Sequence, residues 1–541
     1  MPEELSTNNQ QVSVASAPKS NFSIVNFSKI IILLLVVGVT AFLVFIFFLK
    51  EKPNEEKVVT GLEREQINLG WTSLSGIYPK SSNPPTIDDT NFNDSVFEAL
   101  TKVRSSGIVP AIATKWTNPD TSTWRFTIRT GIKFQSGEIL TVEDVKYSFD
   151  QVLENAEDEE KAWPSTNSVS TVKEVKIIDD KTVDIITNKP DPLLLNRITD
   201  VYILSKKQTE RDGLDKATGT GPFKIVSFTK DEEAIVERFG GYWGTKPKLK
   251  KAKFIVYETD DDLLKALKNQ EIDYARVETN NTGLSNDFQI RKEDEPRVVM
   301  LFFNFAAKEL NGKPNPLLQK SVREAVKLSI DNNKVIKIAS VSGKKANQFI
   351  TKSIVGYNPE IQDNIKDATK AKVLLKDTNS ANLEFDIYIT ADREEVAKAI
   401  SAELADSGIK TNIKVVESFS LLVKDLFAGK AATFIAGPLA SDGGEYIDGI
   451  FRTEADSNLL SYSSSKVDQE IEKVNKSFVP KERKKLLENL VAEIVADVPV
   501  IPLYSVTNTF IIRNNYDFNT NILTDFILES VSGREIKTTS N

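Results

Sequence analysis

An uninterrupted apolar stretch near the N-terminus constrains this chain more than any other feature. Residues 30–49 carry no charge, and seventeen of these twenty residues are Ile, Leu, Val or Phe. At about 1.5 Å per residue, a helix of this length spans roughly 30 Å, the thickness of a bilayer's hydrocarbon core. Summed over its apolar residues, the free energy of inserting this helix into a membrane is favourable by about 5 to 10 kcal/mol. The sequence therefore predicts one transmembrane helix at residues 30–49.

Two other interpretations of this stretch are a buried core helix and a cleaved signal peptide. A core helix is disfavoured because the stretch lies near the N-terminus between Lys29 and Lys50, with polar flanks. A signal peptide has an apolar region of about 7 to 15 residues and a small-residue cleavage site, which residues 47–52 (FFLKEK) do not offer. An uncleaved signal anchor fits better. The flanking lysines leave its orientation open, and we expect the large domain outside because long domains translocate largely regardless of charge.

The composition excludes several kinds of chemistry. None of the 541 residues is His or Cys, which excludes a Ser-His-Asp triad, a cysteine nucleophile and ordinary zinc, haem or iron–sulfur sites. The net charge of -8 gives no basic surface of the kind that nucleic acid requires. We therefore expect a protein that is not an enzyme, with no catalytic residue, no metal, no cofactor and no nucleic-acid partner.

Composition also divides the chain into a tail, an anchor, a stalk and a folded part. Residues 1–29 are rich in Ser, Asn and Gln and are predicted to be a disordered tail, while residues 50–65 form a polar, charged stalk. The folded part begins near residue 66. Because domains usually hold about 100 to 200 residues, its length predicts two or three lobes.

Local patterns in the folded part indicate both strands and helices. Residues 174–187 alternate apolar and polar side chains around Asp179 and Asp180, which predicts a hairpin. Residues 141–144 (TVED) have the pattern of a capping box that opens a helix. Residues 480–496 place apolar side chains at helical spacing. The fold is therefore predicted to mix α and β elements.

An ordered series of motifs carries a resemblance to a known family. Residues 111–153 contain TWRFTIRTGIKFQSGEILTVEDVKYSFDQVL, and further pieces follow in order: TGTGPF (218–223), GYWG (241–244), ALKNQEIDYA (266–275), VREAVKLSID (322–331) and DVPVIPLY (497–504). Each piece alone is weak evidence for a family, whereas their occurrence in the family's order is strong evidence. Over residues 66 to 515 the chain resembles the family 5 extracellular solute-binding proteins, which serve peptide-type ABC importers.

The resemblance implies an α/β fold with a two-lobed, periplasmic-binding-protein-like clamshell of type II, preceded by the transmembrane helix. Lobe I is expected at residues 66–297 with a small domain inserted at 97–204, lobe II at 298–505, and a return to lobe I with a C-terminal tail at 506–541. Peptides or a related small solute would bind between the lobes, and the ABC permease subunits would recognise the closed form. The expected location is the cell membrane, single-pass, with the large domain extracytoplasmic. The alternative is a sensory or interaction protein that uses the same clamshell without transport.

Five residues are candidates for contact with the ligand. Peptide-binding members of the family use an Asp in a W-x-x-D stretch to hold the peptide's amino group, and here Leu439 stands at that position. Asp442 reaches that position only if the alignment is shifted. The turn that begins at Asp442, with Glu445 and Tyr446 beside it, is expected to offer its carboxylates to a cation. The alternative is a solvated loop. Trp71 and Tyr78 follow the first strand, in a loop that faces the cleft in this fold. Their aromatic rings either stack on the ligand or pack within the lobe.

Two other patterns have simpler explanations than a site. Residues 219–222 (GTGP) resemble a phosphate cradle, but no Lys-Ser or Lys-Thr follows, and Pro222 has no N–H to donate, so we interpret them as a turn. The acidic runs 157–160 and 258–262 lack the spacing of a calcium loop and are interpreted as solvated surface.

Overall fold

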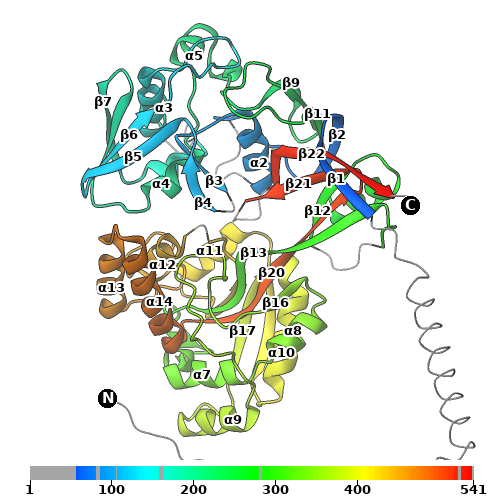
Figure 1. The fold of residues 1–541 in the computed structure, drawn as a ribbon. Helices are drawn as coiled ribbons and strands as arrows, with labels where there is room; N and C mark the ends of the chain where they lie inside the picture. The colour runs from blue at the N-terminus through cyan, green and yellow to red at the C-terminus, as the bar shows by residue number, and fades with distance from the viewer. Residues whose placement is uncertain are drawn as a thin grey trace, which may run out of the picture. The chain divides into compact units, whose positions relative to one another are not determined.

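The computed structural model describes residues 56–80, 86–104, 106–156, 163–278, 283–440, 442–521 and 526–538 (Figure 1). Thr60–Glu535 form one compact unit, and residues 1–59 and 536–541 form a second. Of the second unit, the described residues belong to strands β1 (Glu56–Leu62) and β22 (Phe526–Thr538). The membrane helix predicted at residues 30–49 lies outside the described residues, and no helix among those described is long and apolar enough to cross a bilayer.

A single sheet of eleven strands extends through the compact unit. Its order is β18 (Lys410–Val416), β17 (Glu384–Thr390), β19 (Thr433–Ala436), β13 (Phe288–Phe303), β20 (Val500–Arg513), β12 (Tyr274–Val277), β2 (Arg64–Trp71), β11 (Leu249–Val256), β10 (Glu233–Arg238) and β9 (Phe223–Thr229), with β16 (Gly343–Lys345) paired to β20. Strands β13 and β20 pair along almost their whole length, as Figure 1 shows. They therefore join the β12 side of the sheet to the β19 side.

The pairing of β13 with β20 is interrupted at its middle. Asp294 lies opposite Thr507, but the next paired residue of β13 is Val298, opposite Ser505. The three residues between them include Pro296, which has no N–H for the ladder. Such a bulge bends a strand and turns its side chains in new directions. We call residues 60–294 and 507–535 the first lobe and residues 295–506 the second lobe, so this bulge marks the crossing between them.

The first lobe has its own core and a small four-stranded sheet. The sheet has the order β5 (Ala113–Asp120), β6 (Thr123–Ile128), β8 (Thr182–Thr187) and β7 (Val172–Asp179). The hairpin predicted at 174–187 is confirmed as β7 and β8. The other elements are α2 (Ile87–Val96), β3 (Thr101–Arg104), β4 (Gly107–Pro110), α3 (Val142–Glu154), α4 (Leu194–Arg197), α5 (Lys206–Asp212), α6 (Asp260–Lys268) and β21 (Tyr516–Thr520). The predicted capping box is confirmed at the start of α3, where Thr141 and Asp144 bond reciprocally.

The second lobe buries both faces of its part of the sheet. Along β13, Val299, Leu301 and Phe303 enter one hydrophobic cluster, whereas Val298, Met300 and Phe302 enter another, as the two-residue repeat of a strand requires. The other elements of this lobe are β14 (Glu309–Leu310), β15 (Lys313–Pro314), α7 (Lys320–Leu328), α8 (Asn332–Ile338), α9 (Ala368–Asp377), α10 (Glu394–Ala405), α11 (Phe419–Phe427), α12 (Gly443–Phe451), α13 (Ser465–Asn475) and α14 (Pro480–Asp497). Helix α14 confirms the helix predicted at 480–496.

The GTGP segment is packed against backbone. A Cβ atom on Gly219 would lie 2.2 Å from the carbonyl oxygen of Val96, and one on Gly221 would lie 2.5 Å from the same oxygen. The N–H of Gly221 also donates to that oxygen at 2.9 Å. These glycines thus permit a close approach to the end of α2, which agrees with the interpretation as a turn.

Candidate ligand-binding site

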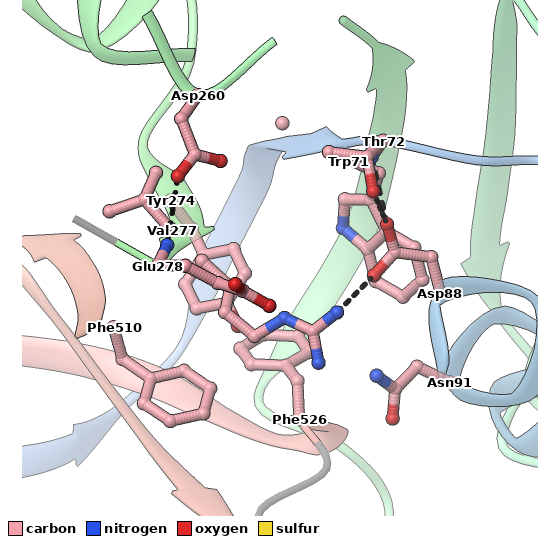
Figure 2. Close-up of a pocket in the computed structure, with 12 residues that line it drawn as sticks. Trp71, Thr72, Asp88, Asn91, Asp260, Tyr274, Val277, Glu278, Phe510 and Phe526 are labelled. Carbon is pink, nitrogen blue, oxygen red and sulfur yellow. Dashed lines mark hydrogen bonds and ion pairs between the residues drawn. The ribbon is translucent and has the colours of Figure 1, made fainter. Parts of the chain in front are cut away.

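A polar pocket lies where two parallel strands of the first lobe end. Strands β2 and β12 are parallel neighbours, and their last residues line a cavity of about 240 Å³ together with residues of α2 and α6 (Figure 2). Phe510 of β20 and Phe526 of β22 complete the wall. In sheets with parallel strands, ligands bind outside the carboxyl ends of the strands, which is where this pocket lies. We call it the strand-end pocket.

Carboxylates outnumber cations in the strand-end pocket. Of the described residues, Asp88, Asp260 and Glu278 line it with one guanidinium, that of Arg276, which lies 3.5 Å from Asp88. Asp88 also accepts hydrogen bonds from the N–H and the hydroxyl of Thr72, at 2.8 and 2.9 Å. Burial raises the pKa of Asp260, although the N–H of Glu278 donates to it. The excess negative charge favours a ligand with an ammonium or guanidinium group.

Two buried polar atoms of this pocket lack a hydrogen-bond partner among the described residues. They are Nε1 of Trp71, whose side chain is 3% exposed, and Oδ1 of Asn91, which is 6% exposed. The Trp71 ring is held edge-on against Phe254, with centroids 4.9 Å apart. Buried polar groups are nearly always paired, and an unpaired one needs an explanation such as water or a ligand. The pocket thus presents one unused donor and one unused acceptor beside its carboxylates.

Arg297, in the bulge of β13, connects this pocket to the second lobe. Its guanidinium donates to Glu278 at 3.1 Å and to the buried Glu295 at 2.6 Å. Its backbone forms an isolated β-bridge with Leu439. Leu439, at the position of the family's Asp, therefore lies at the crossing between the lobes, with 45% of its side chain exposed.

The second lobe contributes an apolar pocket near the same crossing. Its volume is about 510 Å³, and its lining includes Phe302, Phe419, Phe434, Gly437 and Ile450. The rings of Phe302 and Phe434 are stacked with centroids 4.6 Å apart. Gly437 ties this pocket to Arg297, because a Cβ atom on Gly437 would lie 3.5 Å from the Arg297 side chain. We call it the apolar pocket.

The structure places the two aromatic candidates differently. Trp71 lines the strand-end pocket, as described above. Tyr78 is 1% exposed in the core of the first lobe, with its ring edge-on to Trp163 and Tyr202. Its hydroxyl lies 3.0 Å from that of Ser165, and burial raises its pKa far above the usual range. Its packing accounts for Tyr78 without a ligand.

The three candidates at the start of α12 are already engaged with protein groups. Asp442 caps the helix and forms an ion pair with Arg483, with both side chains nearly buried. Glu445 accepts from Arg197 of the first lobe at 3.1 Å. The Tyr446 ring is stacked against Phe349, and burial raises its pKa. Both carboxylates of this turn thus already contact an arginine, and Glu445 shares its arginine with Asp191.

A buried carboxyl beside the Arg197–Glu445 contact gives the protein a pH dependence. Burial raises the pKa of Asp200 to about 7, and the negative charges of Asp94 and Glu445 add to this, although Ser168 donates to it. A carboxyl with a raised pKa in the folded state binds a proton more tightly than in the unfolded chain. Its contribution to stability is therefore greatest in acid and is lost as the pH rises through about 7.

We expect Asp200→Asn to remove this dependence. Relative to the variant, the free energy of unfolding of the native chain falls by about 2 kcal/mol between pH 5 and pH 7, because the folded state holds the extra proton there. Urea titrations of both proteins at several pH values measure this difference. Stability curves that stay parallel from pH 5 to pH 8 would show that Asp200 ionises normally.

Comparison of the sequence with known protein families places the chain in one of them. Residues 107–458 match the family described as "Bacterial extracellular solute-binding proteins, family 5 Middle". The dipeptide-binding protein of Escherichia coli (strain K12) is 28% identical over 362 residues, 58% of this chain and 65% of that protein. The nickel-binding protein NikA of Staphylococcus aureus is 24% identical over 415 residues, 74% of this chain and 81% of that protein.

Solved structures show the same architecture. The ABC transporter substrate binding protein CtaP from Listeria monocytogenes matches with a TM-score of 0.76 and 20% identity, over 87% of this chain and 99% of that chain. The fold is thus the two-domain α/β fold of periplasmic binding proteins. This chain belongs to the bacterial extracellular solute-binding proteins of family 5, whose members bind solutes for ABC import.

Proposed function

We propose that this chain is a membrane-anchored, extracytoplasmic solute-binding protein of an ABC importer, which captures oligopeptides or a related small solute between its lobes and delivers it to the permease. The strand-end pocket is the observation that carries this proposal. It combines three carboxylates with an unused donor and an unused acceptor, all beside the crossing between the lobes.

The two pockets suit different parts of one ligand. An amino group meets Asp260, for which no ion pair is recorded among the described residues, while Trp71 Nε1 and Asn91 Oδ1 supply a donor and an acceptor for a peptide unit. The apolar pocket accepts an apolar side chain. A solved relative, DppA from Helicobacter pylori, is described in complex with the peptide STSA. A peptide with a free amino terminus and apolar side chains therefore fits both pockets.

Binding alone is sufficient for this function. A ligand that contacts both lobes stabilises the closed arrangement by its differential affinity for the closed over the open state. The Arg197–Glu445 contact already joins the two lobes in the described arrangement. Residues 30–49 are proposed to hold the chain at the outer face of the membrane.

A ligand screen of the full-length chain in detergent tests the proposal. Pools of di- to decapeptides with free amino termini are compared with the same pools after N-acetylation, and thermal stabilisation is measured because a ligand of the native state raises it by RT ln(1 + [L]/Kd). We expect hits worth about 2.7 kcal/mol at a hundredfold excess over Kd, weakened by acetylation. Stabilisation by no free-amino pool would contradict the proposal.

The substitution Asn91→Ala separates binding from stability. Because Oδ1 of Asn91 has no hydrogen-bond partner in the described part of the chain, its removal is expected to leave the free energy of unfolding unchanged or slightly increased. The affinity for a screened peptide should fall about tenfold, the worth of one hydrogen bond to the ligand. Calorimetric titration measures the affinity, and urea unfolding measures the stability. A loss of stability with unchanged affinity would assign Asn91 a structural role.

A further inference from the structure

A third cavity is lined by both lobes and lies apart from the two pockets described above. Its volume is about 570 Å³. From the first lobe it is lined by the β3–β4 hairpin and by residues around α4, including Ile108 and Leu193. From the second lobe it is lined by residues 353–355 and by the start of α14. It shares no lining residue with the strand-end pocket or the apolar pocket. We call it the α14 cavity.

The positive end of α14 faces this cavity without a cap. Pro480 is the first residue of the helix, and Val479, at the capping position, has no side-chain oxygen. An α-helix of eighteen residues carries a partial positive charge at its N-terminus, where the first N–H groups have no partner within the helix. Lys481 and Lys484 line the cavity at this end, and the nearest carboxylate recorded for Lys484 is Glu488 at 3.9 Å.

Two side chains of the cavity have buried polar atoms without a partner among the described residues. Arg483 is 7% exposed and lines the cavity, and its Nε has no partner among the described residues. Asp442 engages only the two terminal nitrogens of that guanidinium, which leaves the Nε edge available. The hydroxyl of Ser477, which also lines the cavity, is buried and equally without a partner. Both atoms can donate to an anion.

The charges and the apolar lining together define a ligand class. Among the described residues, Lys481, Arg483 and Lys484 share the lining with one carboxylate, that of Asp442, so this part of the cavity has an excess of positive charge. The remaining wall is mostly apolar and includes Ile108, Leu193, Ile354 and Phe478. We propose that the α14 cavity is a separate binding site for a small apolar molecule that carries one carboxylate. The carboxylate lies at the start of α14, and the apolar body lies between the lobes.

Calorimetric titration of the full-length chain with 2-naphthoate tests this site, with titration into empty micelles subtracted. The uncharged 2-naphthylmethanol has nearly the same apolar body and is the matched probe. We expect 2-naphthoate to bind and the alcohol to bind at least about tenfold more weakly, because only the carboxylate receives charge-assisted hydrogen bonds. Equal affinities, or no binding of 2-naphthoate at millimolar concentration, would overturn the proposal.

Variants of exposed lysines locate the site without disturbing the fold. Lys481→Met combined with Lys484→Met should weaken 2-naphthoate about tenfold and leave the alcohol within about twofold. Lys485→Met is the control, because it removes the same charge from the same helix outside the cavity. Ile108→Glu, on the opposite wall, should also weaken 2-naphthoate through repulsion. An unchanged double variant, an equal effect of the control, or competition of 2-naphthoate with a peptide from the screen would overturn the assignment.

Discussion

Replacing Asp442 by Ala is expected to lower the free energy of unfolding by about 4 to 6 kcal/mol. The carboxylate holds Arg483 through two hydrogen bonds of 2.6 and 3.1 Å, and both side chains are nearly buried. Removal of one partner of a buried ion pair costs about 3 to 5 kcal/mol because the other charge stays buried. The lost cap of α12, where Asp442 accepts from Gly444 N–H at 2.7 Å, adds about 1 kcal/mol. Urea unfolding followed by tryptophan fluorescence measures the loss.

Three further variants divide this effect into its parts. Asp442→Asn keeps a capping oxygen and should recover only the contribution of the cap, about 1 kcal/mol. Asp442→Leu with Arg483→Met removes both charges and should be more stable than Asp442→Ala. Asp363→Asn is the exposed control. It breaks the ion pair between Asp363 and Lys345, two side chains that are each 47% exposed, and should lower the free energy of unfolding by less than about 1 kcal/mol. Equal losses from Asp442→Asn and Asp363→Asn would show that burial of the Asp442 pair has no energetic consequence.

Local patterns in the sequence predicted local structure because they need no distant partner. The alternation in 174–187, the capping box at Thr141 and the helical spacing in 480–496 each depend on neighbours a few residues away. All three are present in the structure. The ordered motifs predicted the fold for a related reason, since they mark turns and close approaches such as that of Gly219 to Val96.

The roles of single side chains depended on partners far away in the sequence. Asp442 meets Arg483, 41 residues later, and Glu445 meets Arg197, 248 residues earlier. The sequence of the turn at 442–446 does not indicate either partner. Tyr78 likewise follows the first strand as expected, but rings from Trp163 and Tyr202 enclose it.

A signal for the strand-end pocket was nonetheless present in the sequence. Residues 274–277 follow a turn that contains Glu271 and Asp273 and form the short strand β12, which is parallel to β2. Arg276 and Glu278, at and just after its end, therefore reach the carboxyl edge of the sheet together with Trp71. Arg276 and Glu278 are therefore the residues that strand-end reasoning would have selected. The sequence does not show which strand lies beside β2, because Tyr274 and Leu69, which pair there, are far apart along the chain.

Replacing Arg297 by Met is expected to lower the free energy of unfolding by about 3 to 5 kcal/mol at neutral pH. Glu295 is 1% exposed, and Arg297 is the only partner recorded for its carboxylate among the described residues. Without the guanidinium, a buried negative charge remains at the crossing between the lobes. Urea unfolding measures the loss. Lys344→Met is the matched control, because it breaks the neighbouring exposed pair with Asp294 and should cost less than about 1 kcal/mol.

A double variant separates the charge of Glu295 from the packing of the bulge. Glu295→Met combined with Arg297→Met leaves no buried charge at this pair and should restore much of the stability. A double variant that is no more stable than Arg297→Met would mean that the guanidinium acts through packing of the bulge and not through the charge of Glu295.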